Sequence, residues 1–338
     1  MLTTSTAQQK THPVVTSISQ VFGTSMGYAE AVLDHIINNW KDYPSIEELY
    51  AQNSESRVYL EYSLGAMWRG RQVAQRIKAL HPNPKRALDI GSGSGGVLVA
   101  LAEQDINVLG VELEPHLVAL SKLATQDFNC VEVVSANVLT SDTESWGKFD
   151  VICCNAVIEH VLNPERLLSQ IGTLLADGGV VHIEIPNKDC ISNTIQDLHY
   201  QMFGLQLLPR SGALSLHRSL MPNTDYTVGE FFDLDWYQSR LRRLNISTEL
   251  LISDWGSRYE TAEADLGRLW AAFEQWNQQA ETENNYLLRH EVRRRFLRYF
   301  SDACFALAAA HEGDPDSFER KYGAMAWVLV GGRKPHSY

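Results

Sequence analysis

Residues Arg86–Gly96, with the sequence RALDIGSGSGG, decide the fold of this chain. The apolar residues Ala87, Leu88 and Ile90 predict a short strand, and four glycines follow within the next six positions. The apolar segment Val97–Leu101 comes next and predicts a helix. Glycine suits such a turn because the backbone must bend sharply and let a ligand approach closely. A strand, a tight turn and a helix N-terminus in this order predict a nucleotide-type cofactor site.

The glycine spacing alone leaves the cofactor open. Gly91, Gly93 and Gly96 fit G-x-G-x-x-G, the pattern of dinucleotide-binding turns, and so permit a nicotinamide oxidoreductase. Asp89, two positions before the first glycine, counts against that class, because a carboxylate repels phosphates and suits a cationic ligand. The next predicted strand ends in Glu112, where an acid can accept hydrogen bonds from ribose hydroxyls.

Five stretches, in one order, resemble the motifs of class I S-adenosylmethionine-dependent methyltransferases. They are LDIGSGSG (88–95), GVELEPHLV (110–118), FDVICCNAVIEHV (149–161), NPERLL (163–168) and LLADGGVVHIEIPN (174–187). The EHV and PN signatures resemble in particular the ubiquinone-biosynthesis O-methyltransferase type of small-molecule enzymes. The matched core covers about a third of the chain, and five ordered motifs are more specific than a glycine pattern alone.

This resemblance implies S-adenosylmethionine as the cofactor and a set of residues that bind it. Asn137 stands where many members of the family carry an acid beside the adenine, and its side-chain oxygen can still contact the amino group. An arginine at the end of the N-terminal helices often meets the cofactor carboxylate, and Arg69 is nearer the expected place than Arg71. The implied cofactor-binding residues are Asp89, Gly91, Ser92, Gly93, Gly95, Glu112, Leu113, Asn137, Val138, Asn155 and Arg69.

Apolar runs alternate with helical segments, which predicts a parallel sheet with helices on both faces. The predicted strands are 87–90, 108–112, 131–135, 151–154, 180–185, 246–253 and 325–331. The resemblance implies a Rossmann-like seven-stranded sheet, in which the seventh strand runs antiparallel between the fifth and the sixth. The predicted parts are an N-terminal helical cap (1–80), the cofactor-binding core (81–190), a substrate-pocket insertion and helix (191–244), and the last two strands with a helical insert at 254–322 (245–338).

Outside the core, hydrophobic periodicity and capping signals predict further helices. In the cap we expect a loose arm at 1–13, a helix at 26–40, a helix starting at Ser45 and one long helix at 56–80. After the fifth strand we expect mostly loop at 188–226 and then a helix at 227–244. In the helical insert, the five arginines between 289 and 298 are expected to be solvated. The alternative is that Arg289 or Arg293 meets an anionic substrate group.

Methyl transfer to oxygen needs the acceptor held in line with the methyl group and usually a base for its proton. His160 follows the fourth predicted strand, in the EHV motif. His199 lies in the insertion that related enzymes use as a wall of the substrate pocket. We expect His199 to be the base and His160 to be the second candidate, whereas His182, among apolar strand residues, is expected to be a core residue. His217 is less well placed by any motif.

Composition narrows the class of protein further. A chain of 338 residues with a formal net charge of −12 argues against nucleic-acid and anionic-membrane partners. Five scattered cysteines show no paired spacing, so neither a zinc site nor a disulfide framework is expected, and no metal is predicted. There is no signal-peptide pattern and no apolar run of membrane-spanning length. We expect a soluble cytoplasmic enzyme with a small-molecule acceptor, and its helical additions could pair as a homodimer.

Several functional classes remain open at this level. The leading hypothesis is a small-molecule O-methyltransferase whose acceptor is a phenol, a sugar or a carboxylate. A small-molecule N-methyltransferase is the nearest alternative, although Asn155-Ala-Val-Ile departs from the N/D-P-P-Y/F pattern of many amino-methylating enzymes. A non-catalytic cofactor-binding scaffold, with the helical inserts serving a partner, is the third.

Overall fold

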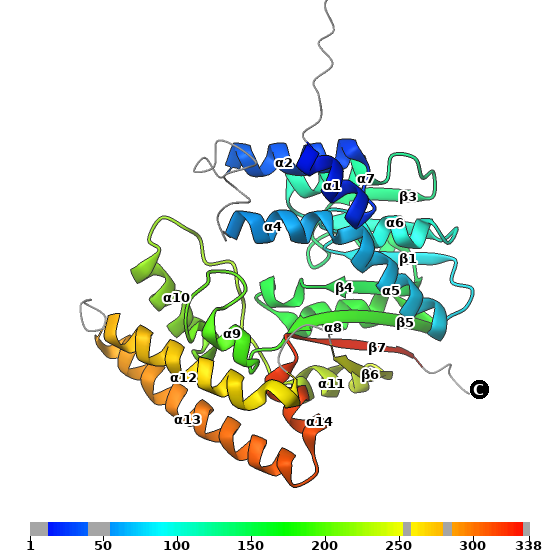
Figure 1. The fold of residues 1–338 in the computed structure, drawn as a ribbon. Coiled ribbons are helices and arrows are strands. Elements are labelled where there is room, and N and C mark those ends of the chain that lie inside the picture. Colours follow the sequence, from blue (N-terminus) through cyan, green and yellow to red (C-terminus); the bar gives the residue numbers. More distant parts are fainter. Residues whose placement is uncertain (1–12, 40–54, 253–257, 280–285, 334–338) are drawn as a thin grey trace, which may run out of the picture. The chain divides into compact units, whose positions relative to one another are not determined.

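The computed structural model describes residues 13–39, 55–252, 258–279 and 286–333 (Figure 1). The chain divides into two compact units, residues 1–153 and residues 154–338. Its strands form one sheet in the order β3-β2-β1-β4-β5-β7-β6, which confirms the predicted seven-stranded α/β fold. The strands are β1 (Arg86–Ile90), β2 (Asn107–Glu112), β3 (Val131–Ser135), β4 (Phe149–Asn155), β5 (Leu175–Pro186), β6 (Ile246–Ile252) and β7 (Ala326–Arg333). The four-part division predicted from the sequence stays a prediction.

In residues 1–153, the strands β1, β2 and β3 run parallel. Helix α6 (Gly96–Ala102) follows β1, and helix α7 (Pro115–Ala124) follows β2. The last residues of β1 pair with the last residues of β2, with Ile90 opposite Val111. Because parallel neighbours end at the same edge of a sheet, the glycine turn after β1 and the acid at the tip of β2 meet there.

Four helices precede the first strand: α1 (Pro13–Phe22), α2 (Met26–Asn39), α4 (Glu55–Leu64) and α5 (Ala66–Leu80). Their apolar side chains, with Tyr28, Val32 and Leu60 among them, form one cluster with Val99 of α6 and Leu120 of α7. These helices are therefore packed onto the cofactor-binding core of the first unit and share its hydrophobic interior.

Helices α5 and α6 touch backbone to backbone. A Cβ atom added to Gly70 would lie 2.1 Å from the carbonyl oxygen of Gly96, and one added to Gly96 would lie 2.1 Å from the carbonyl oxygen of Ala66. Only glycine allows such an approach, so the last glycine of the sequence motif serves helix packing.

One prediction for the N-terminal region was wrong, and one helix was missed. The long helix predicted at 56–80 is divided at Gly65 into α4 and α5, although Gly65 keeps a right-handed helical conformation with φ −78° and ψ −2°. Helix α1 was not predicted at all. The helix predicted at 26–40 is confirmed as α2, whereas residues 1–12 and the helix predicted to start at Ser45 lie outside the described residues.

In residues 154–338, strand β7 pairs antiparallel with both β5 and β6. This confirms the predicted position and direction of the seventh strand. Helix α8 (Pro164–Leu174) leads into β5, and its first turn is capped by Asn163, whose side chain accepts a hydrogen bond from the backbone N–H of Arg166 at 3.0 Å.

The helices of the second unit have a hydrophobic core of their own. Helix α9 (Ile191–Ile195) and helix α10 (Arg210–Leu220) share it with the long helices α12 (Ala262–Gln279) and α13 (Tyr286–His311) and with α14 (Pro315–Phe318) (Figure 1). The predicted helical insert is confirmed, with Leu269 and Phe296 fully buried in facing stripes. None of the described helices has both the length and the apolar character needed to cross a bilayer.

Residues 188–226 are loop over about half of their length, as expected, but they also contain the helices α9 and α10, which were not predicted. Two other expectations for this unit were wrong. The helix predicted at 227–244 is only α11 (Leu234–Arg243), because Gly229 instead donates its N–H to the carbonyl oxygen of Glu159 at 2.6 Å. The arginines of α13 are not all solvated, since Arg289 is buried and Arg295 donates to the carbonyl oxygen of Leu207.

Candidate active site

The glycine turn of the first unit is built from left-handed backbone. Gly91, Gly93 and Gly95 have φ angles of +71°, +53° and +89°, which side chains other than glycine rarely adopt. A Cβ atom on Gly95 would lie 3.1 Å from the Cα atom of Ser121, whereas one on Gly93 would meet nothing closer than 4.0 Å. The turn is packed against α7 on one side and leaves open space at Gly93, as a ligand cradle requires.

Glu112 closes this turn. Its Oε2 atom accepts a hydrogen bond from the N–H of Gly93 at 2.9 Å. Its Oε1 atom accepts from the N–H groups of Leu113 and Glu114 at 2.6 Å and 3.0 Å. The carboxylate is 8% exposed, so it is a nearly buried acceptor whose position is set by the backbone around it.

Asp89 lies on the neighbouring strand and is also buried, with 2% of its surface exposed. Burial and the nearby charge of Glu112 raise the pKa of Asp89 well above its ordinary range. Two nearly buried carboxylates next to an open glycine turn fit a ligand that donates hydrogen bonds and carries positive charge. The amino group and ribose hydroxyls of S-adenosylmethionine meet that requirement, so the residues present fit this cofactor.

Other predicted cofactor residues of this unit are placed as follows. Arg69 lies over the ring of Tyr62, with 3.6 Å from its guanidinium carbon to the ring centroid, and donates to the Tyr62 carbonyl oxygen. The side-chain oxygen of Asn137 accepts from the N–H of Leu139 at 2.9 Å. Val138 and Ser92 are buried and Leu113 is exposed. Their contacts with a cofactor stay predictions.

In the second unit, the predicted cofactor-binding residue Asn155 forms a hydrogen bond with His182. The Nδ1 atom of His182 lies 2.7 Å from the Oδ1 atom of Asn155, and His182 is fully buried in β5. This confirms that His182 is a core histidine with a hydrogen-bond partner.

The two histidines predicted to act in catalysis lie against each other. His160 ends a short 3-10 turn after β4 (Ile158–His160), and His199 lies in the loop after α9. Their rings meet edge to face, with 5.0 Å between centroids. Burial and the neighbouring His160 lower the pKa of His199 to about 4, so the His199 ring is neutral at pH 7.

Glu159 completes this histidine cluster. It is 2% exposed, and burial raises its pKa to about 8. One donor atom from each of Glu159, His160 and His199 lies within 4.8 Å of the others, so the three could also hold a divalent cation, which the sequence did not predict.

Asp197 fixes the loop that carries His199. Its Oδ1 atom accepts from the N–H groups of His199 and Tyr200, both at 2.9 Å, and its Oδ2 atom accepts from Met202 at 2.7 Å. The fully buried His217 packs on Tyr200, with 4.3 Å between ring centroids. Asp197 was not predicted as a site residue, although an aspartate two positions before His199 is the usual signal of a turn held by its own side chain.

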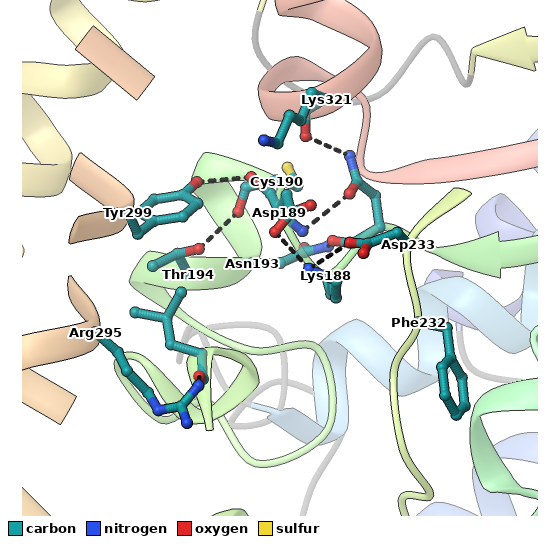
Figure 2. A network of polar contacts seen from close by, with 12 residues as sticks. Lys188, Asp189, Cys190, Asn193, Thr194, Phe232, Asp233, Arg295, Tyr299 and Lys321 are labelled. Atoms are coloured by element: carbon teal, nitrogen blue, oxygen red, sulfur yellow. Dashed lines mark hydrogen bonds and ion pairs between the residues drawn. The ribbon is translucent and has the colours of Figure 1, made fainter. Parts of the chain in front are cut away.

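A polar network around Asp189 fixes the segments on either side of this loop (Figure 2). The hydroxyl of Tyr299, on α13, donates to the Asp189 carbonyl oxygen at 2.6 Å. The Lys188 ammonium lies 2.9 Å from carboxylate oxygens of both Asp189 and Asp233. Burial acts to lower the pKa of Lys188, yet the two carboxylates outweigh it and raise that pKa. The start of α9 is thereby joined to α13 and to the segment before α11.

A mostly parallel sheet with a left-handed glycine turn and two buried acids at its edge fits the class I S-adenosylmethionine-dependent methyltransferases. The family model described as "Methyltransferase domain" matches residues 66–246, which is more than half of the chain. The chain therefore belongs to this methyltransferase family.

Curated relatives carry the name ubiquinone biosynthesis O-methyltransferase. The protein of Acinetobacter baumannii (strain ACICU) is 26% identical over 141 residues, which cover 41% of this chain and 59% of the relative. That of Coxiella burnetii (strain Dugway 5J108-111) is 28% identical over 111 residues, covering 31% and 45%. The matched part thus spans only about half of each relative's length.

Among solved structures, similarity is found to SAM-bound CalS10, an amino pentose methyltransferase from Micromonospora echinaspora. It is 26% identical, with 35% of this chain and 50% of that chain covered and a TM-score of 0.31. An O-methyltransferase family protein from Burkholderia thailandensis is 13% identical, with 92% and 73% covered and a TM-score of 0.46.

Proposed function

We propose that this protein is a small-molecule O-methyltransferase in which His199 removes the proton of the acceptor hydroxyl. The observation that carries the proposal is the His160–His199 pair, with a neutral His199 ring held edge-on to its partner by the Asp197 turn. A ring nitrogen of His199 lies within 4.8 Å of donor atoms of Glu159 and His160, so this cluster contains a proton acceptor.

The residues of the first unit account for cofactor binding in this proposal. When bound, S-adenosylmethionine supplies an electrophilic methyl group. Asp89 would hold the cationic amino group, and Glu112 would accept hydrogen bonds from the ribose hydroxyls. The glycine turn contributes free space and a helix N-terminus, both of which favour close approach of the ligand.

The histidine pair accounts for the proton. An alcohol or phenol must lose its proton as the oxygen attacks, and a positioned base assists that step by about 10²- to 10⁴-fold. The low pKa keeps His199 unprotonated throughout the neutral range. His160 is exposed to solvent and touches His199, so it offers the proton a route to water.

Methyl transfer from radiolabelled S-adenosylmethionine to phenols, glycosides, carboxylates and small amines tests the proposal, with mass spectrometry locating the methyl group. We expect an O-methylated product. His199→Asn should lower kcat by at least a hundredfold and leave cofactor affinity intact, while His290→Ala, on the exposed side of α13, serves as the matched control.

Three results would contradict the proposal. A product methylated only on nitrogen would assign the N-methyltransferase class. Cofactor binding without transfer to any acceptor would favour the non-catalytic scaffold. Activity that is lost with a chelator and restored by Mg²⁺ or Zn²⁺ would assign the cluster of Glu159, His160 and His199 to a metal instead of to proton transfer.

A further inference from the structure

Helix α13 has apolar side chains on two opposite faces. One face contributes Val292 and Phe296, both fully buried, to the hydrophobic core that α13 shares with α12, beside which it runs (Figure 1). On the other face Leu287 is 82% exposed, Phe305 is 71% exposed and Leu297 is 50% exposed. A helix that is apolar all round is typically covered all round, so this second face is a candidate interaction surface.

The exposed apolar residues are aligned along the helix. Leu287 and Phe305 are separated by five complete turns, at about 3.6 residues per turn. Leu297 lies within about 80° of both, at about 100° per residue. The same face carries the small, exposed residues Ser301 and Ala308. We call these five residues the α13 stripe.

Charge is distributed unevenly along the same segment. Residues 286–300 hold five arginines and one glutamate, a net charge of +4 with histidine neutral. Residues 301–316, in which α13 ends and α14 begins, hold four acidic side chains and no lysine or arginine, a net charge of −4. The segment therefore has a basic half and an acidic half of equal and opposite charge.

Contacts within the chain use only part of this charge. Glu291 forms ion pairs with Arg294 and Arg295 at 2.8 Å and 2.6 Å. Arg298 and Asp302 are both exposed, and neither forms an ion pair with another described residue. These two side chains lie one helical turn apart on the same flank of the α13 stripe, so they are available to a partner.

A second copy of the helix matches this charge distribution in one direction only. In a parallel pair the two basic halves would lie side by side, and so would the two acidic halves. In an antiparallel pair each basic half lies along the acidic half of the other copy. With a two-fold axis at Ser301, Leu297 of one copy lies opposite Phe305 of the second, and Arg298 lies beside Asp302 of the second.

The apolar and the charged residues have different effects in such a pair. Covering the exposed surface of Leu287, Leu297 and Phe305 supplies the affinity. Exposed ion pairs add little free energy, so the charges mainly select the antiparallel direction. The small side chains of Ser301 and Ala308 allow the two helices to come close at the centre, because the distance between packed helices depends on the side chains at the contact.

We propose that the α13 stripe is a self-association surface, which packs against the same stripe of a second copy of this chain. The two helices run antiparallel, and the two-fold axis passes close to Ser301. Because the same patch serves both copies, the contact is closed and stops at a dimer. This proposal is independent of the proposed methyl transfer, and its tests require neither cofactor nor acceptor.

Analytical ultracentrifugation of the full chain across the micromolar range measures the association. We expect the wild-type protein to form dimers, and Phe305→Glu should raise the dimer Kd at least tenfold, because it places a charge in the apolar centre of the contact. Leu220→Glu, at an exposed leucine that ends α10, is the matched control and should leave the Kd unchanged. Circular dichroism should show the same helix content in all three proteins, since both substituted side chains are exposed.

Charge exchange tests the direction of the helices. Arg298→Asp and Asp302→Arg should each weaken the dimer, because each brings like charges together across the contact. The double variant should regain the wild-type Kd, since it opposes unlike charges again.

Cross-linking tests the position of the axis. A cysteine at the axis faces its own copy, so Ser301→Cys in a Cys304→Ser background should form an intermolecular disulfide on mild oxidation. Gln275→Cys in the same background, at an exposed position of α12, should not.

Each possible result bears on the proposal. A wild-type protein that stays monomeric throughout overturns it and assigns the α13 stripe to a different partner. A dimer with the same Kd in wild type and Phe305→Glu shows that another surface associates. A dimer that needs Phe305 but is neither restored by the charge exchange nor cross-linked through Ser301→Cys overturns the antiparallel arrangement.

Discussion

The Glu112 carboxylate accepts a hydrogen bond from the backbone N–H of Gly93, with 2.9 Å between Oε2 and the nitrogen. The tip of the second strand is thereby joined to the turn that follows the first. Glu112 therefore has two roles. Its carboxylate stabilises the conformation of the glycine turn, and it is also the proposed hydrogen-bond acceptor for the ribose of the cofactor.

Glu112→Ala should weaken S-adenosylmethionine binding at least tenfold, because three backbone N–H groups lose their acceptor together with the proposed ribose contact. Isothermal titration measures the change, with NADH as the control ligand. Glu114→Ala, at the exposed neighbouring acid, should bind as the wild type does. An unchanged affinity in Glu112→Ala would remove this residue from the cofactor site.

Glu159 makes stability depend on pH. Its pKa is raised from 4.5 to about 8 in the folded protein, so between these values the folded state holds a proton that the unfolded state releases. This contribution to the free energy of unfolding is fully present below about pH 4.5 and is lost as pH rises to about 8, on the order of 5 kcal/mol in all. Urea unfolding at pH 5 and pH 8 should show this loss in the wild type and a smaller one in Glu159→Gln. Equal pH dependence in both proteins would contradict the assignment.

The low pKa of His199 sets an acid limit for the proposed base. Since the ring takes up a proton only near pH 4, kcat/KM should stay level with respect to this group from neutral pH down to about pH 5 and fall below that. The pH profile of a good acceptor measures it, in parallel with cofactor affinity at each pH. An inflection near pH 6.5 that disappears in His199→Asn would show that the histidine is not held neutral.

The contact between α5 and α6 gives a stability prediction. Gly70→Ala and Gly96→Ala each place a methyl group 2.1 Å from a backbone oxygen, so the helices must separate, at a cost of about 1–3 kcal/mol or more in unfolding free energy. Gly267→Ala is the matched control, because a Cβ atom there meets nothing within 4 Å and the position is helical. Urea unfolding measures the free energy of unfolding of the three variants. Equal unfolding midpoints for Gly70→Ala, Gly96→Ala and Gly267→Ala would show that the contact between α5 and α6 is not tight.

The core could be predicted from the sequence because its signals are local. The glycine turn, the apolar runs and the capping residue Asn163 act within a few positions, and the structure confirms the strands that they predict. The candidate active site could be predicted only in part. His199 and His160 were named from their motifs, but only the folded chain shows that their rings touch across 39 positions of sequence (residues 160–199).

The errors arise where distant contacts override local preference. Residues 227–233 were predicted to be helical yet form no helix, and there the N–H of Gly229 donates to the carbonyl oxygen of Glu159 in the loop after β4. Arg289 is charged yet buried, since α13 packs on several other helices. Gln206 carries no motif, and only the described fold shows that its buried side-chain amide has no hydrogen-bond partner.

The insertion of β7 between β5 and β6 has a consequence for synthesis on the ribosome. Both β5 and β6 are translated long before β7 (residues 326–333). The helices α12 and α13 lie between β6 and β7 in the sequence. Until β7 has been synthesised, β6 cannot form its backbone hydrogen bonds with β7, and one edge of β5 has no neighbouring strand. Unpaired strand edges of this kind promote misassembly. The second unit therefore completes its sheet only after residues 326–333 have been translated, whereas β1, β2 and β3 can pair well before that point.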